Sequence, residues 1–103
     1  MIARTWHGAV PDAKADAYET YLQLTGIPDY ESTPRNRGVY ILRRSAGGIT
    51  DFLLITFWDS YDSIRAFAGD DPEQARYYPE DTEYLLELEP AVTHYEVAYQ
   101  SRR

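Results

Sequence analysis

Two histidines are the side chains of this sequence best suited to proton transfer near neutral pH. His94 falls in an apolar stretch near the C-terminus, and the carboxylate of Glu96, two positions further on, shares its face of a strand. This pair predicts a general base or, alternatively, an ordinary strand histidine bonded to a neighbour or to water. His7 precedes Gly8 at the far end of the first apolar stretch, where we predict either a ligand contact or a surface histidine.

The aromatic residues could form a substrate pocket. The chain contains ten tyrosines, and a buried tyrosine brings both apolar area and a hydrogen-bonding hydroxyl. Trp6, Trp58 and Phe67 are candidates for the pocket walls. Trp58 ends the most apolar stretch, so core packing is the alternative for that residue.

The sequence predicts neither a metal site nor a bound cofactor. Cysteine is absent, which excludes thiolate ligands, disulfides and thiol nucleophiles. The acidic group of Asp70, Asp71 and Glu73 matches no calcium-loop spacing and predicts a solvated turn. No glycine-rich phosphate loop is present, so nothing in the sequence indicates a nucleotide or a flavin.

Composition narrows the choice of partners and location. The net charge of −7 argues against nucleic acid, because phosphate contacts need clustered lysine and arginine. No window reaches the roughly 18 consecutive apolar residues that a membrane span needs, and the start MIARTW does not resemble a signal peptide, so we expect a cytoplasmic protein. A second acidic run predicts a solvated helix face; its members are Glu80, Asp81, Glu83, Glu87 and Glu89.

Hydrophobic periodicity predicts one domain that spans residues 1–103. Gly47-Gly48 is typical of a hairpin turn between two strands. The predicted elements are a strand at 2–10, a helix at 13–24, a loop to 37, strands at 38–45 and 50–58, a helix capped by Asp59-Ser60 that runs to about 68, short helices at 72–77 and from 79 or 80 to 88, and a strand at 91–99. This order is the α+β, ferredoxin-like βαββαβ plan with a four-stranded antiparallel sheet.

Both faces of the predicted sheet are apolar. Helices cover one face, and the other face should carry polar residues if it meets water. The third strand instead places Leu53, Ile55 and Phe57 opposite the face that holds Phe52 and Leu54. Monomers rarely expose an apolar patch of more than roughly a few hundred Å², so we predict a homodimer in which two sheets pack face to face.

The sequence resembles the antibiotic biosynthesis monooxygenase-like proteins of the dimeric α/β-barrel superfamily. The similar stretches are IARTW, ITFWDSYDSIRAFAGDD and HYEVAY, and the resemblance covers nearly the whole chain. The middle stretch is the most specific, with an apolar strand that ends in Trp58, an Asp59-Ser60 cap, and a helix that carries Ile64 and Phe67. The resemblance implies a homodimer that forms an α/β barrel, and a pocket in each subunit between the sheet and its helices.

Members of this family differ in activity: some oxidise phenolic polyketides with O₂ and no metal or flavin, some degrade haem, and some act on quinols. Haem-degrading members carry an iron-binding histidine about one segment after the position of Phe67, where this chain has Tyr77 and Tyr78. Tyrosine departs from that pattern and instead suits a hydrogen bond to a phenolic substrate, or closure of the helix layer.

The resemblance therefore implies a cofactor-independent monooxygenase-like oxidoreductase that acts on an aromatic, phenolic or quinol-type molecule. The alternative is a non-catalytic dimer that binds a hydrophobic ligand or takes part in a stress response. We predict three catalytic residues and four substrate contacts: His94, Tyr78 and Tyr77, and Trp6, His7, Trp58 and Phe67.

Overall fold

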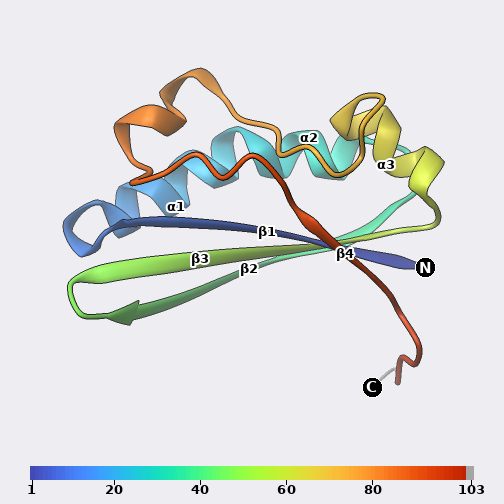
Figure 1. Cartoon of the computed structure of the whole chain (residues 1–103), viewed down its shortest axis with the longest axis horizontal. Helices are drawn as coiled ribbons and strands as arrows, with labels where there is room; N and C mark the ends of the chain where they lie inside the picture. The colour runs from blue at the N-terminus through green and yellow to red at the C-terminus, as the bar shows by residue number, and fades with distance from the viewer. Residues whose placement is uncertain (102–103) are drawn as a thin grey trace.

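Four strands form one antiparallel sheet in the computed structural model, which describes residues 1–101 (Figure 1). The strands are Ile2–Pro11 (β1), Asn36–Ala46 (β2), Ile49–Trp58 (β3) and Thr93–Glu96 (β4). They lie in the order β2-β3-β1-β4, and all three neighbouring pairs are antiparallel. This topology confirms the predicted α+β, ferredoxin-like fold, with β1 and β3 at the centre of the sheet.

The helices lie on one face of this sheet (Figure 1). They are the α-helices Ala15–Leu24 (α1), Gly26–Ser32 (α2) and Tyr61–Ala68 (α3), and the 3-10 helices Asp12–Lys14 (η1) and Pro79–Glu83 (η2). The cap of α3 predicted at Asp59-Ser60 is confirmed, and Ser60 is the capping residue of the pair, because its hydroxyl accepts a hydrogen bond from the N–H of Ser63 at 3.3 Å.

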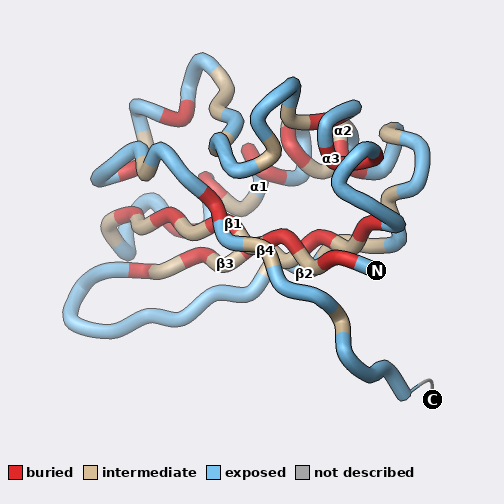
Figure 2. Tube along the Cα trace, turned by 45° about the vertical axis from the view of Figure 1, so that its right-hand side comes forward, coloured by how far each residue is buried: buried red, intermediate tan, exposed pale blue. Residues whose placement is uncertain are grey.

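The two central strands alternate between a buried and a more open face (Figure 2). On β1 the residues Arg4, Trp6 and Val10 point into the helix layer, and Thr5 and His7 point to the other side. The face opposite the helices is called the open face below. Because successive strand residues point to opposite sides, this alternation decides which side chains reach a site between sheet and helices.

The structure corrects the prediction of a loop between residue 24 and residue 37, because α2 occupies Gly26–Ser32. Pro28 is the third residue of α2, where the missing N–H breaks no intrahelical hydrogen bond. Tyr30 is buried on the inner side of α2 and stacks on Phe67 at 4.3 Å between ring centroids. Packing of one tyrosine thus stabilises a helix that the few apolar residues of this stretch did not indicate.

The predicted helices at 72–77 and 79–88 are also corrected, since only η2 forms there, and the last strand is shorter than predicted. The backbone groups of these stretches bond to each other: Ala75 N–H donates to the Pro90 carbonyl at 3.0 Å, and Val92 N–H to the Glu73 carbonyl at 2.9 Å. These long-range bonds satisfy groups that a helix would otherwise pair locally. The stretch from Gly69 to Val92, called the roof segment below, therefore crosses the helix layer as mostly irregular chain (Figure 1).

We expect Gly8→Ala to lower the free energy of unfolding by about 1–3 kcal/mol, because a Cβ at Gly8 would overlap the ring of Trp6 and lie 2.8 Å from Leu85 Cδ2. Urea denaturation would measure the change. Gly26→Ala is a matched control, since its added methyl group would approach no atom closer than 3.7 Å. Equal stability of both variants would contradict this account of the packing between Trp6 and Leu85.

Candidate functional site

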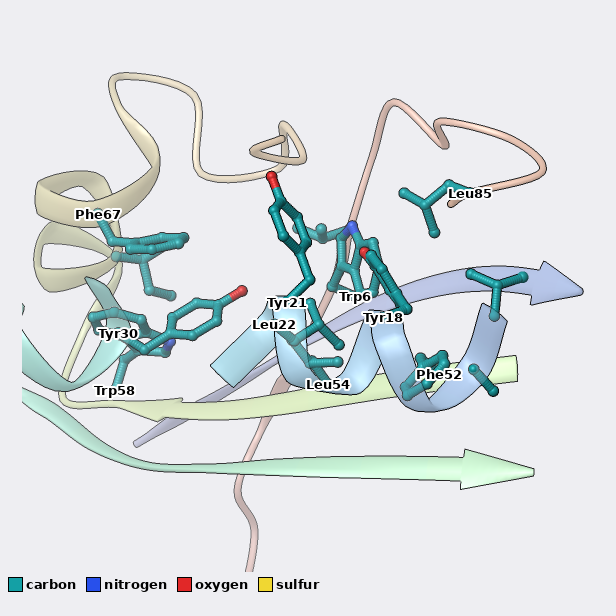
Figure 3. Close-up of a cluster of buried hydrophobic side chains, with 14 of the residues drawn as sticks. Trp6, Tyr18, Tyr21, Leu22, Tyr30, Phe52, Leu54, Trp58, Phe67 and Leu85 are labelled. Carbon is teal, nitrogen blue, oxygen red and sulfur yellow. The ribbon is translucent and has the colours of Figure 1, made fainter. Parts of the chain in front are cut away.

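A small cavity lies between the sheet and the helices, at the place that the resemblance implied. Its volume is about 20 Å³, which is enough for about one water molecule. The lining residues come from the sheet, from α1 and α2, and from the roof segment: Trp6, Tyr18, Leu22, Gly26, Tyr30, Leu54, Arg76, Tyr78 and Asp81. Figure 3 shows the hydrophobic part of this set, with Trp6 and Leu54 on the sheet and Tyr18, Leu22 and Tyr30 on the helices.

Asp81 is the buried acid of the cavity, with 3% of the residue exposed. The Tyr18 hydroxyl donates a hydrogen bond to one carboxylate oxygen at 2.9 Å, and the Tyr78 N–H donates to the other at 2.6 Å. Burial raises the pKa of Asp81, and these two hydrogen bonds counteract part of the rise. The pKa of Asp81 therefore lies closer to neutral pH than the pKa of an exposed aspartate, which suits its carboxylate better to accept a proton near neutral pH.

The prediction that Asp81 belongs to a solvated helix face is wrong. The chain forms only the short η2 at this point, and the N–H groups of Tyr84 and Leu85 both donate to the Asp81 carbonyl. The side chain turns inward to accept hydrogen bonds at the start of η2, as an acidic residue in the first turn of a helix often does. The neighbouring Glu80 and Glu83 are exposed, although they are acids like Asp81. The residue types of an acidic run therefore do not indicate which of its members is buried.

Trp6 and Tyr78 are the two predicted site residues that line the cavity. The indole Nε1 of Trp6 is buried and has no hydrogen-bond partner among residues 1–101. The Tyr78 hydroxyl donates to Asp29 Oδ2 at 2.5 Å, and burial together with this bond raises the pKa of Tyr78. Tyr77 packs edge-on against Trp6, with 6.1 Å between the ring centroids, and its hydroxyl donates a hydrogen bond to the Glu89 carbonyl.

Trp58 and Phe67 lie next to the cavity and do not line it. Trp58 is fully buried, and its indole N–H donates to the hydroxyl of Thr56 at 2.8 Å. Both rings pack against Tyr30, which is itself a lining residue, and Figure 3 shows the three rings together. Their role as substrate contacts stays a prediction.

His94 occupies β4 on the side of the sheet that faces the helices, opposite Arg4 in the β1–β4 register. Its Nε2 is buried without a hydrogen-bond partner in residues 1–101, and its ring meets Tyr61 edge-on at 5.4 Å. Burial and the charge of Arg4 lower the pKa of His94, although Glu73 acts in the other direction. His94 does not line the cavity, so its role as general base stays a prediction.

His7 lies on the open face, on the opposite side of the sheet from the cavity. Its ring lies between two carboxylates, with Nδ1 at 2.5 Å from Glu89 and Nε2 at 2.8 Å from Asp51. Partial burial disfavours the charged ring, but the hydrogen bonds to Glu89 and Asp51 outweigh burial and raise the pKa of His7. The two carboxylates bind different ring nitrogens, so they do not converge on one point as metal ligands would.

Within residues 1–101, no three histidine or carboxylate side chains gather in a way that could hold a metal ion. In the same part of the chain, every helix is too short or too polar to cross a membrane.

No protein-family model matches the sequence, and no curated protein matches it either. Solved structures do match. One is a crystal structure of a MhuD mutant with two manganese protoporphyrin IX molecules bound per active site, at a TM-score of 0.68 and 17% identity over 100% of both chains. Another is a Bacillus cereus protein described as an antibiotic biosynthesis monooxygenase, at a TM-score of 0.67 and 11% identity over 97% of both chains. The chain therefore shares the α+β, ferredoxin-like fold of these two structures, and the resemblance seen in the sequence is confirmed at the level of the fold.

Proposed function

We propose that this protein is a cofactor-independent monooxygenase-like enzyme, which oxidises an aromatic, phenolic or quinol-type molecule with O₂ in the cavity between sheet and helices. The observation that carries the proposal is the buried carboxylate of Asp81 in a cavity otherwise lined largely by aromatic and aliphatic residues. Cofactor-independent oxygenation needs an apolar site and a group that removes a proton from the substrate. Asp81 has the burial and the raised pKa that suit this second role.

The proposed reaction starts when the phenolic O–H gives its proton to Asp81. The substrate anion then transfers one electron to O₂, and the resulting radical and superoxide combine into a peroxide anion. This anion takes the proton back from Asp81, and the hydroperoxide loses water as a carbonyl group forms at the oxidised carbon. One atom of O₂ ends in the product and the other in water, so the substrate is the only reductant.

An aromatic substrate needs more room than the cavity of about 20 Å³ offers. Arg76 and Tyr78 are its more exposed lining residues, and both belong to the irregular roof segment. We propose that these side chains move outward when substrate binds. In the bound state Tyr78 would then donate a hydrogen bond to the substrate in place of Asp29.

The residues around the cavity do not fit a porphyrin. A tyrosine binds haem iron well only as the phenolate, and burial together with the bond to Asp29 favours the neutral form of Tyr78. The Tyr77 hydroxyl is engaged by the Glu89 carbonyl. We therefore propose a function without haem, and titration with haemin should leave the Soret band of the free pigment unshifted.

Oxygen uptake with a panel of hydroquinones and anthrone-type phenols would test the proposed function. We expect at least one substrate to be consumed faster than by its autoxidation, and heat-denatured protein to show no acceleration. If the protein binds members of the panel and accelerates none of them, it is the non-catalytic binding protein that the sequence left as an alternative.

We also propose that the protein works as a homodimer in which two open faces pack together. Large apolar side chains are exposed there, including Tyr40 and Tyr95 at 59% and 58%. Leu53, Ile55 and Phe57 of β3 are half-buried between them. A hollow of about 600 Å³ between Tyr40, Phe57 and Gln100 would take side chains of the partner.

We expect Ile55→Lys to convert a dimer into a monomer, because a charge at the centre of the open face cannot be buried against a second sheet. Light scattering should give twice the 11.9 kDa of one chain for the unmodified protein and 11.9 kDa for the variant. Leu24→Lys is the control, since Leu24 is 73% exposed at the end of α1, in the helix layer. A monomeric unmodified protein would contradict the proposed dimer.

The raised pKa of His7 predicts a dependence of stability on pH. A raised pKa in the folded state stabilises the protein fully below the ordinary value of 6.5, and this contribution is lost as the pH rises through the folded pKa. Glu89→Gln should remove much of this pH-dependent stabilisation, but not all of it, because Asp51 still bonds to the His7 ring. Arg44 lies opposite Asp51 in the sheet. Urea denaturation from pH 5 to 9 measures the difference in the free energy of unfolding between the unmodified protein and Glu89→Gln. The lowered pKa of His94 affects the stability of both proteins equally and cancels in this difference. A difference that does not change with pH would contradict the assignment.

A further inference from the structure

Arg4 is a buried cation that lacks an anionic partner. The residue is 1% exposed; its guanidinium donates a hydrogen bond to the Gln74 carbonyl at 3.0 Å and also interacts with the hydroxyl of Tyr30. Its Nε has no partner among residues 1–101, and no carboxylate of those residues forms an ion pair with it. Burial accordingly lowers the pKa of Arg4. A guanidinium is strongly hydrated in the unfolded chain, so such a position is unfavourable unless another group compensates the charge.

A second arginine lies close to Arg4. Both guanidinium groups lie over the ring of Phe67, at 5.5 Å for Arg4 and 4.8 Å for Arg76. Tyr30 stacks on the same ring, and the charges of both arginines act to lower its pKa against the effect of burial. Among the described residues Asp29 is the one carboxylate paired with Arg76, so two cations and one anion lie around Phe67, next to the cavity.

The other unpaired polar atoms gather around Arg4. Three buried side-chain nitrogens lack a hydrogen-bond partner in the described chain, and they belong to Arg4, Trp6 and His94. Trp6 follows Arg4 by two positions on the same face of β1, and His94 lies opposite Arg4 on β4. Arg4 offers an N–H donor, as does His94 when its Nε2 carries the proton, whereas the Trp6 indole lies close to the Tyr77 hydroxyl. A ligand with acceptor oxygens would match this group of donors.

We propose that the cavity recognises an aromatic ligand that carries a carboxylate, with the carboxylate bound by Arg4 and Arg76. The orientation rests on the proposed function, which assigns the phenolic hydroxyl of the same ligand to Asp81. Arg76 and Asp81 both line the cavity, so one ring could span them. Arg4 does not line it, and the carboxylate would reach Arg4 by displacing the Tyr30 hydroxyl that bonds to it. Figure 3 supports this orientation, because Tyr30, the neighbour of the arginines, and Tyr18, the neighbour of Asp81, lie on opposite sides of Tyr21 and Leu22.

Binding of gentisate, of methyl gentisate and of hydroquinone would test the proposal. The three share the hydroquinone ring, and gentisate alone carries a carboxylate. Isothermal titration without O₂ should give a Kd for gentisate that is at least about tenfold lower than for the other two, as expected for charge-assisted hydrogen bonds. Equal Kd values for the three ligands would overturn the proposal, whatever the variants do.

Two variants test whether the arginines cause the preference for gentisate. Arg4→Met should abolish the preference for gentisate, and Arg76→Met should weaken it. Arg65→Met is the control, because Arg65 pairs with the exposed Asp62 on α3, and it should keep the full preference. A preference that survives both Arg4→Met and Arg76→Met would also overturn the proposal.

Thermal unfolding of Arg4→Met separates binding from structure. Removing an uncompensated buried charge should keep or raise the melting temperature. A lower melting temperature with an unchanged preference for gentisate would make Arg4 a purely structural residue and contradict the proposal. Because no O₂ is present, a preference for gentisate combined with an absence of oxygen uptake would reject the proposed oxidation and leave this inference standing.

Discussion

Replacing Asp81 with asparagine is expected to lower the rate of oxygen uptake by about 10²–10⁴-fold, because the amide cannot accept the phenolic proton. Asparagine has nearly the same shape: its oxygen can still accept the hydrogen bond from the Tyr78 N–H, and its NH2 group can donate to the Tyr18 hydroxyl, which can turn to accept. The fold and the binding of substrate should therefore persist. Glu80→Gln is the matched control, since Glu80 is the exposed neighbouring acid, and its rate should stay at the level of the unmodified protein.

The pH profile adds a readout that a merely structural role for Asp81 would not change. The base must be ionised to act, so the rate should rise with pH through the raised pKa of Asp81. That rising limb should disappear in Asp81→Asn. A variant that keeps both the rate and the limb would show that another group removes the proton, and His94 would be the next residue to replace.

Replacing Trp58 with alanine is expected to lower the free energy of unfolding by about 3–5 kcal/mol, because the indole is fully buried and its loss leaves a large cavity. The indole also packs against Tyr30 and Phe67, so its loss would loosen the wall behind the cavity. Chemical denaturation monitored by circular dichroism would measure the change. Trp58→Phe should cost clearly less, and Tyr99→Ala, at a residue that is 83% exposed, should cost almost nothing.

A small loss of stability in Trp58→Ala together with a large loss of substrate binding would contradict the packing role. It would instead support the prediction that Trp58 contacts the substrate.

The sheet could be predicted from the sequence because its signal is local. Period-two alternation along β1 and β3 places Trp6 and Leu54 on one face and His7 and Leu53 on the other, and the structure shows the same division. The Gly47-Gly48 turn could be predicted for the same reason, because glycine readily adopts the positive φ that such a turn requires, and both residues have a positive φ in the structure.

The cavity was harder to predict because it depends on contacts distant in sequence. Asp81 is buried through Tyr18, 63 positions away in the chain, and nothing in its acidic surroundings indicates this bond. The helix α2 depends on the contact of Tyr30 with Phe67. Trp6 and Tyr78 could be predicted as cavity residues because they are aromatic. Asp81 could not be predicted, because its residue type does not distinguish it from the exposed acids around it.

The roof segment has a consequence for the dynamics of the protein. It carries Arg76, Tyr78 and Asp81, yet β-sheet hydrogen bonds hold little of it, and the N–H of Leu86 is bonded to the Ala9 carbonyl at the edge of β1. Such a segment can unfold locally at a fraction of the free energy that global unfolding requires. Its amide protons, including those of Tyr84 and Leu85, should exchange with solvent deuterium faster than those of β1 and β3. Exchange would then slow when a ligand occupies the cavity, and the frequency of local opening would set an upper limit on how fast a ligand can enter.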